Sequence, residues 1–154
     1  MRKKFKHLCF KYKTFFFLSI LISSHPNELL ALPIKTKILN TKKQIIGLAN
    51  VYIDYVELQE IDGTQKGKLG FVNIKGGFQI FVVKESGQEN LVGSAKNRRI
   101  YDNKGTLIGH YDWTTFWSYV YSPSGKKLGK AKCIAFRGIC AAGIASFLTG
   151  LLDD

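Results

Sequence analysis

The sequence predicts a small, mostly β domain: an antiparallel meander or partly open β-barrel with one short C-terminal apolar helix, preceded by an N-terminal signal segment. Three observations predict this class. Short runs rich in β-branched and aromatic residues alternate with glycine-containing turns over residues 32–136. Residues 137–154 are rich in alanine and leucine instead, which favours a helix. With 154 residues and 45% apolar residues, the chain is long enough for one domain with its own core.

The N-terminal segment, residues 1–31, has the parts of a secretory signal. Six Lys or Arg and no acid lie within residues 1–13, and residues 14–24 are mostly apolar. That apolar stretch is shorter than the roughly 20 residues of a transmembrane helix. We expect cleavage after Ser24 or Ala31 and export to the periplasm, the extracellular space or an equivalent lumen. Retention as an uncleaved signal-anchor, which would tether the domain to a membrane, is the alternative.

The β domain, residues 32–136, shows a repeated pattern of strand, glycine turn and strand. A turn glycine is followed a few residues later by an apolar residue and a second glycine, as in YDNKGTLIGHY and YSPSGKKLGKA. The spacing of these units suits consecutive hairpins in a meander. The run VYIDYVEL (51–58) is predicted as one of the strands.

The most aromatic run is YDWTTFWSYVY, residues 111–121. Taken as one strand, it places two tryptophans and three tyrosines on a single face, because strand side chains alternate with period two. Aromatic side chains bury large areas, so we expect this face in the core. Trp113 and Trp117 would lie inside, and Tyr119 or Tyr121 would lie at a rim.

The C-terminal segment, residues 137–154, is predicted as an apolar helix packed on the β domain. It carries no charge between Arg137 and Asp153 and is apolar nearly all round. Three placements remain open: over a sheet face or barrel end, in a membrane, or at a partner interface. Gly138, Gly143 and Gly150 would each weaken an isolated helix, so close packing has to compensate.

Two cysteines of the exported chain, Cys133 and Cys140, form a candidate disulfide. Cysteines in an oxidising compartment often pair, and a turn near Arg137–Gly138 would bring these two together. Two small buried apolar side chains are the alternative. We predict no metal site, because no histidine accompanies the two thiols.

The residue types that support catalysis are sparse. His110 and Asp112 share a strand face, so a small hydrolase is a weak alternative, but no nucleophile motif accompanies them. The acids of residues 54–62 are typical of solvated strand and turn positions. We therefore predict a non-enzymatic protein without cofactor.

Basic and aromatic residues interleave between residues 96 and 137, where nine Lys or Arg are opposed by two Asp. Outside residues 1–24 the net charge is +6 rather than +12, and this region alone carries +7. The predicted ligand-binding residues are Lys96, Arg98, Arg99, Lys126, Lys127, Lys130, Tyr119 and Tyr121.

Such a surface favours anionic partners. We expect a binding or envelope-associated module for an anionic lipid, glycan or protein. Nucleic acid is not expected, because the predicted export removes the chain from the cytoplasm. The alternative function is a membrane-active, toxin-like effector that contacts membranes through residues 138–152. The oligomeric state stays open.

Overall fold

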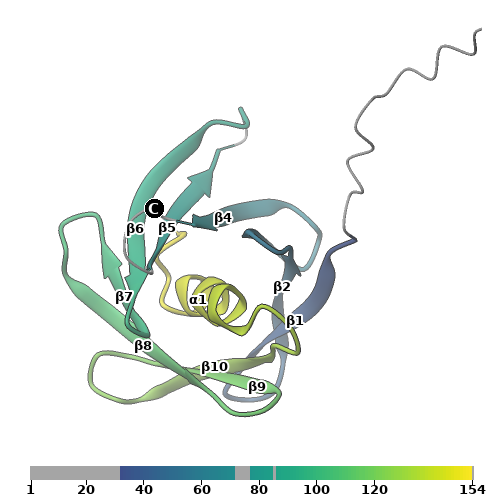
Figure 1. Ribbon diagram of the computed structural model, residues 1–154, viewed down its shortest axis with the longest axis vertical. Helices are drawn as coiled ribbons and strands as arrows, with labels where there is room; N and C mark the ends of the chain where they lie inside the picture. The colour runs from purple at the N-terminus through teal and green to yellow at the C-terminus, as the bar shows by residue number, and fades with distance from the viewer. Residues whose placement is uncertain (1–31, 72–76, 85, 154) are drawn as a thin grey trace, which may run out of the picture. The chain divides into compact units, whose positions relative to one another are not determined.

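The protein is a closed, ten-stranded antiparallel barrel with one helix in its lumen (Figure 1). The computed structural model describes residues 32–71, 77–84 and 86–153, so the predicted signal segment lies outside the described residues. Each strand pairs with its neighbour in sequence, and β1 pairs with β10. The elements are β1 Ile34–Asn40, β2 Ile45–Val51, β3 Tyr55–Gln59, β4 Gln65–Phe71, β5 Gly77–Val83, β6 Glu89–Lys96, β7 Arg99–Asp102, β8 Leu107–Trp113, β9 Trp117–Tyr121, β10 Lys127–Lys132 and α1 Arg137–Leu148.

The predicted fold class is confirmed, and the barrel is closed rather than partly open. Closure comes from the pairing of the first and last strands, in which Ile38 lies opposite Ala131 and Asn40 opposite Gly129. This pairing removes both sheet edges, so no row of unpaired backbone groups is left for another chain to bind.

Helix α1 runs through the centre of the barrel (Figure 1), where residues 139–146 are all buried. We expected a helix over a sheet face or barrel end, and its place in the lumen explains its composition better. A helix surrounded by strands buries every side, so it needs no polar face. Among the described residues, no helix is long and apolar enough to span a bilayer.

Side-chain sizes on the wall and on the helix are complementary. Near the C-terminal end of α1, glycines of the wall face the large side chains of residues 147–152; a Cβ on Gly67 would lie 2.8 Å from Leu152. In the middle of α1 the sizes reverse, and a Cβ on Gly143 would lie 2.9 Å from Val56. Large residues opposite small ones let the lumen fill at the density of a protein interior.

Five equivalent hairpins build the wall. Each has a residue in the left-handed region, followed by a strand glycine that faces the C-terminal end of α1 or the residues after it. The left-handed residues are Lys43, Gly63, Gly87, Gly105 and Gly125, and the strand glycines are Gly47, Gly67, Gly93, Gly109 and Gly129. The first hairpin was not predicted from the sequence, because Lys43 stands where the other four hairpins have a glycine.

The prediction that residues 111–121 form one strand is wrong. Residues 114–116 reverse the chain between β8 and β9, and the amide of Thr114 donates to the Trp117 carbonyl at 2.8 Å. The reversal puts Trp117 on the outside, whereas Tyr111 and Val120 are buried. The run 51–58 is likewise split, between β2 and β3. Across each turn the buried positions change from odd to even residue numbers, from Tyr111 to Val120 and from Val51 to Val56, and the residue types alone do not reveal this change of phase.

The predicted disulfide between Cys133 and Cys140 is present, with Cα atoms 5.9 Å apart. It joins the residue that follows β10 to the first turn of α1. The amide of Cys133 also donates to the carbonyl of Phe116 at 2.8 Å, so the chain leaving β10 is fixed to the β8–β9 connection. These two links position α1 as it enters the lumen.

Candidate functional site

The outer surface of β9, β10, β1 and β2, together with the hairpin turns between them, is rich in lysine and has no acidic residue in the stretches that build most of it. Residues 32–50 and 113–136, which build most of it, contain no Asp or Glu. Eight lysines lie in these two stretches: Lys35, Lys37, Lys42, Lys43, Lys126, Lys127, Lys130 and Lys132. We call this surface the lysine face.

A groove of about 480 Å³ crosses the lysine face, with Trp117, Leu39 and Ile45 among its apolar lining. Its lysines are Lys35, Lys37, Lys43 and Lys132. The closing β1–β10 ladder brings Lys37 and Lys132 next to one another, since the adjacent pair is Ile38 and Ala131. Like charges at opposing sheet positions destabilise the pairing. These lysines are therefore poorly explained by the stability of the barrel.

Cations of the outer surface lie over aromatic rings. The Lys130 ammonium is 4.0 Å from the centre of the Trp117 ring, and the Lys127 ammonium is 4.2 Å from that of Tyr119. At the β6–β7 turn, the Arg98 guanidinium is 4.3 Å from the Trp113 ring, and it also pairs with Asp112. A ring face attracts a cation, so the contacts of Lys127 and Lys130 hold those two charges in place without neutralising them.

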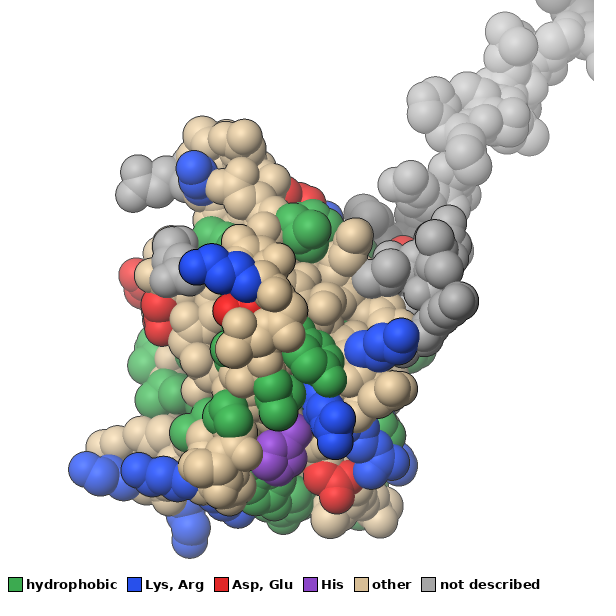
Figure 2. All heavy atoms as spheres, turned by 90° about the vertical axis from the view of Figure 1, so that its left-hand side faces the viewer, with side chains coloured by type: hydrophobic (Ala, Val, Ile, Leu, Met, Phe, Trp, Pro, Cys, Tyr) green, Lys and Arg blue, Asp and Glu red, His purple; other side chains and the backbone are tan. Residues whose placement is uncertain are grey.

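A cross-strand row connects the two halves of the predicted site. Arg99 pairs with His110 across β7 and β8, and His110 pairs with Tyr121 across β8 and β9. Tyr121 in turn pairs with Lys127 of β10. The rings of His110 and Tyr121 stack with their centres 5.2 Å apart. Figure 2 shows the histidine, in purple, with apolar and Lys or Arg side chains beside it.

A second hollow of about 430 Å³ lies beside the β6–β7 turn and is lined by Arg98, Arg99 and His110 among others. Arg98 adopts a positive φ of 62°, which arginine rarely does, and its carbonyl accepts a hydrogen bond from the Tyr111 amide. Its guanidinium donates to Asp112 at 2.7 Å. Burial raises the pKa of the Tyr111 hydroxyl to about 12, against a smaller lowering by Arg98.

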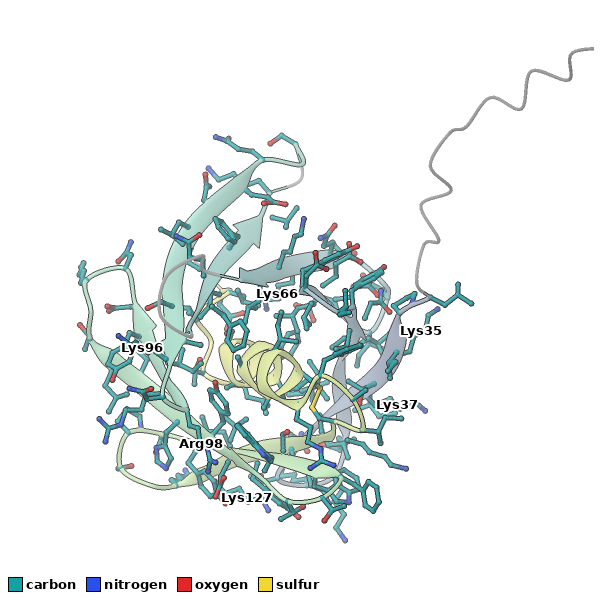
Figure 3. All side chains as sticks on the ribbon, viewed as in Figure 1. Lys35, Lys37, Lys66, Lys96, Arg98 and Lys127 are labelled. Atoms are coloured by element: carbon teal, nitrogen blue, oxygen red, sulfur yellow. A yellow bond between two sulfur atoms is a disulfide. The ribbon has the colours of Figure 1, made fainter. Side chains whose placement is uncertain are left out.

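The structure places the predicted ligand-binding residues in two groups. Lys96, Arg98 and Arg99 lie at the β6–β7 turn, and the other five lie on β9, β10 and their hairpin. Figure 3 shows Lys96 and Arg98 on a different side of the barrel from Lys35 and Lys37. The cross-strand row through His110 joins the two groups.

Sequence reasoning missed the contribution of β1, with Lys35, Lys37 and the groove. The groove exists only because β1 closes against β10, and the two strands are distant in the chain. The alternation of IKTKIL, which puts two lysines on one face of a strand, was the available signal.

The residues of the weak hydrolase alternative make other contacts. Asp112 pairs with Arg98, and His110 stacks on Tyr121. Of the acids of residues 54–62, Glu60 binds Lys66 at 2.9 Å and Asp62 accepts from the Thr64 amide at 2.9 Å. The Thr64 bonds lower the pKa of Asp62, as expected for a carboxylate that stabilises a turn.

Comparison with known proteins gives no further guide: no protein-family model, curated protein or solved structure matches the chain.

Proposed function

We propose that this protein is an exported, non-enzymatic binding module of the cell envelope whose lysine face binds an anionic surface or partner. The observation that carries the proposal is the lysine face itself: eight lysines on two stretches that contain no acid. A surface that served only solubility would intersperse charges of both signs.

The outer surface around β4 supports this interpretation by contrast. There, Lys66 pairs with Glu60 and Asp153, and Lys68 pairs with Glu89. Cations of β4 therefore have carboxylate partners within the barrel, whereas the groove lysines have lysine and aromatic neighbours. An external anion would relieve the repulsion between Lys37 and Lys132, and its binding would weaken with added salt.

The apolar floor of the groove adds a second kind of contact. Trp117 and Leu39 line it between the lysines. Aromatic and aliphatic surface next to cations suits a partner that alternates anionic groups with apolar or ring-shaped parts. Inorganic anions alone would not use this floor.

The test is binding to a soluble polyanion, heparin, and to vesicles that contain anionic phospholipid, over a series of salt concentrations. We expect the triple variant Lys35→Gln, Lys37→Gln, Lys132→Gln to bind both probes at least tenfold more weakly than the wild type, with a shallower dependence on salt. The matched control removes three charges elsewhere: Lys68→Gln, Lys84→Gln, Lys104→Gln.

The control variant should keep its affinity within about twofold, since its lysines lie outside the lysine face. Equal losses in both variants would mean that net charge, rather than this surface, determines binding. Failure of the wild type to bind either probe at low salt would contradict the proposal.

The alternative effector function through residues 138–152 would require α1 to leave the lumen, because residues 139–146 are buried there. No contact in the described residues favours it, and we do not propose it.

A further inference from the structure

We infer that the end of the barrel at which α1 begins docks onto an anionic phospholipid bilayer, with exposed apolar side chains inserted among the lipids. We call this end the helix-start rim. The inference rests on the proposed function and names its partner. It concerns different residues, which lets the two be tested separately.

Three connections at the helix-start rim carry exposed apolar side chains. The chain leaves every even-numbered strand at this end, because the strands alternate in direction. Ile53 lies in the β2–β3 connection and is 63% exposed, and Phe116 in the β8–β9 connection is 54% exposed. Between β10 and α1, Ile134 is 52% exposed and Phe136 42%.

These side chains belong to one continuous part of the rim. The strands that carry them are neighbours in the order β8, β9, β10, β1, β2, β3. The hydrogen bond from Cys133 to Phe116 holds two of the connections together. Other large apolar side chains are exposed singly elsewhere, at Ile45, Ile61 and Leu91. Several such side chains on adjoining connections, by contrast, mark an interaction surface.

Interfacial aromatic residues flank two of the apolar tips. Tyr52 and Tyr55 stand on either side of Ile53, with their rings stacked 4.1 Å apart. Trp113 and Trp117 are the residues that enclose the β8–β9 connection and its Phe116. Tyrosine and tryptophan favour the boundary between lipid and water, since each has an apolar ring and a polar group. An apolar tip between two such residues fits a membrane interface better than a protein pocket of fixed shape.

Phe136 adopts a backbone conformation that is unfavourable for phenylalanine. It occupies the N-cap of α1 with φ 46°, in the left-handed region, and makes no side-chain cap hydrogen bond. A bulky residue is a rare choice for that region, and helix N-caps favour Ser, Thr, Asp or Asn. An exposed phenylalanine at a position so unfavourable to it indicates a role outside the fold.

The charges around the apolar tips suit an anionic bilayer. Lys35 lies at the start of β1, Lys132 at the end of β10 and Arg137 at the start of α1, and all three are exposed. In residues 52–54, 114–116 and 133–136, which form the three apolar connections, Asp54 is the one acid. The groove of the lysine face reaches this rim through Trp117 and Lys132, so inserted tips and bound headgroups would lie side by side.

The opposite end of the barrel lacks this combination. Its five hairpin turns are built mainly from polar residues, and turn residues such as Asn40 and Asp102 accept hydrogen bonds from their own turns. Ile61 is an exposed apolar residue of those turns, at 62%. It gives a control substitution of an exposed apolar residue away from the helix-start rim.

The first experiment uses the two tryptophans of the chain, both of which flank Phe116. Wild-type protein is mixed with vesicles of phosphatidylcholine and phosphatidylglycerol that carry bromine at known depths along the acyl chains. We expect strong quenching by bromine near the headgroup end and weak quenching by bromine at the bilayer centre. Bound protein whose tryptophans are not quenched at any depth would overturn the inference.

The second experiment compares variants. We expect Phe116→Ser, Phe136→Ser to lower partitioning into anionic vesicles at least tenfold while heparin binding stays within twofold of the wild type. Ile61→Ser, at the other end, should change neither. Circular dichroism and thermal unfolding establish that each variant is folded, and the wild-type quenching result stands whether or not they are.

The outcomes separate the two proposals. Binding to heparin without binding to vesicles would refute the membrane inference and leave the anion-binding function standing. Vesicle binding that the two serine substitutions do not weaken would also refute it. Absence of binding to both probes would refute both.

Discussion

The inner and outer faces of the barrel wall come from the same strands but differ in the kinds of residue that they carry. Inward positions carry glycine, alanine and aliphatic residues whose sizes match the part of α1 that they face. Outward positions carry cations and aromatic rings; around β4 the cations have carboxylate partners, and on the lysine face no such partner is found among the described residues. The inner face is explained by packing alone. Packing does not explain the lysines of the lysine face, and we assign the proposed function to this surface.

The largest effect should come from breaking the inner face. Gly67→Val would place a Cβ 2.8 Å from Leu152 and 2.9 Å from the Phe81 carbonyl, so we expect a loss of about 3 kcal/mol or a failure to close the barrel. Gly70, on the outward side of the same strand, has nothing within 4 Å of such a Cβ. Gly70→Val should therefore leave the urea midpoint unchanged or raise it. Similar losses in both variants would contradict the size match between wall and helix.

The next effect concerns the link that holds the helix inside. Replacing both Cys133 and Cys140 with serine should lower the free energy of unfolding by about 2–3 kcal/mol, because the crosslink restricts the unfolded chain. Dithiothreitol should have the same effect on the wild type and none on the double variant. If the reductant leaves the wild-type midpoint unchanged, the disulfide does not contribute to the stability of the packed helix.

The smallest effect distinguishes the two parts of the outer face. Lys66→Met should cost about 1 kcal/mol, because it removes contacts with Glu60 and Asp153. Lys37→Met should cost nothing or stabilise, because its neighbour across the ladder is another lysine. Thermal unfolding of both variants at neutral pH measures the difference.

The Lys66 effect should also depend on pH. Burial lowers the pKa of Lys66, but the hydrogen bonds and charges of Asp153 and Glu60 outweigh it and raise the pKa above 10.5. The folded state thus binds the proton more tightly than the unfolded state, so the contribution is complete below pH 10.5 and is lost as the pH rises through the raised value. A difference between wild type and Lys66→Met that persists well above that pH would show that the ion pairs are not its source.

Several features of the fold could be predicted from the local sequence. Alternation and turn glycines indicated four of the five hairpins, because glycine readily adopts the positive φ that these turns require. The uncharged, mostly apolar composition of residues 138–152 indicated a helix without a polar face, and it left open whether the barrel, a membrane or a partner covers it. The spacing of Cys133 and Cys140 allowed the disulfide that the fold contains.

Other features depended on contacts between distant residues. Barrel closure is the pairing of β1 with β10, and no local sequence pattern indicates which strand pairs with β1. Residues 111–121 are split between β8 and β9 by a reversal at residues 114–116, which the alternation of residue types does not reveal. The groove between Lys37 and Trp117, and the gathering of Ile53, Phe116 and Phe136 at one rim, exist only once the strands have taken their places around α1.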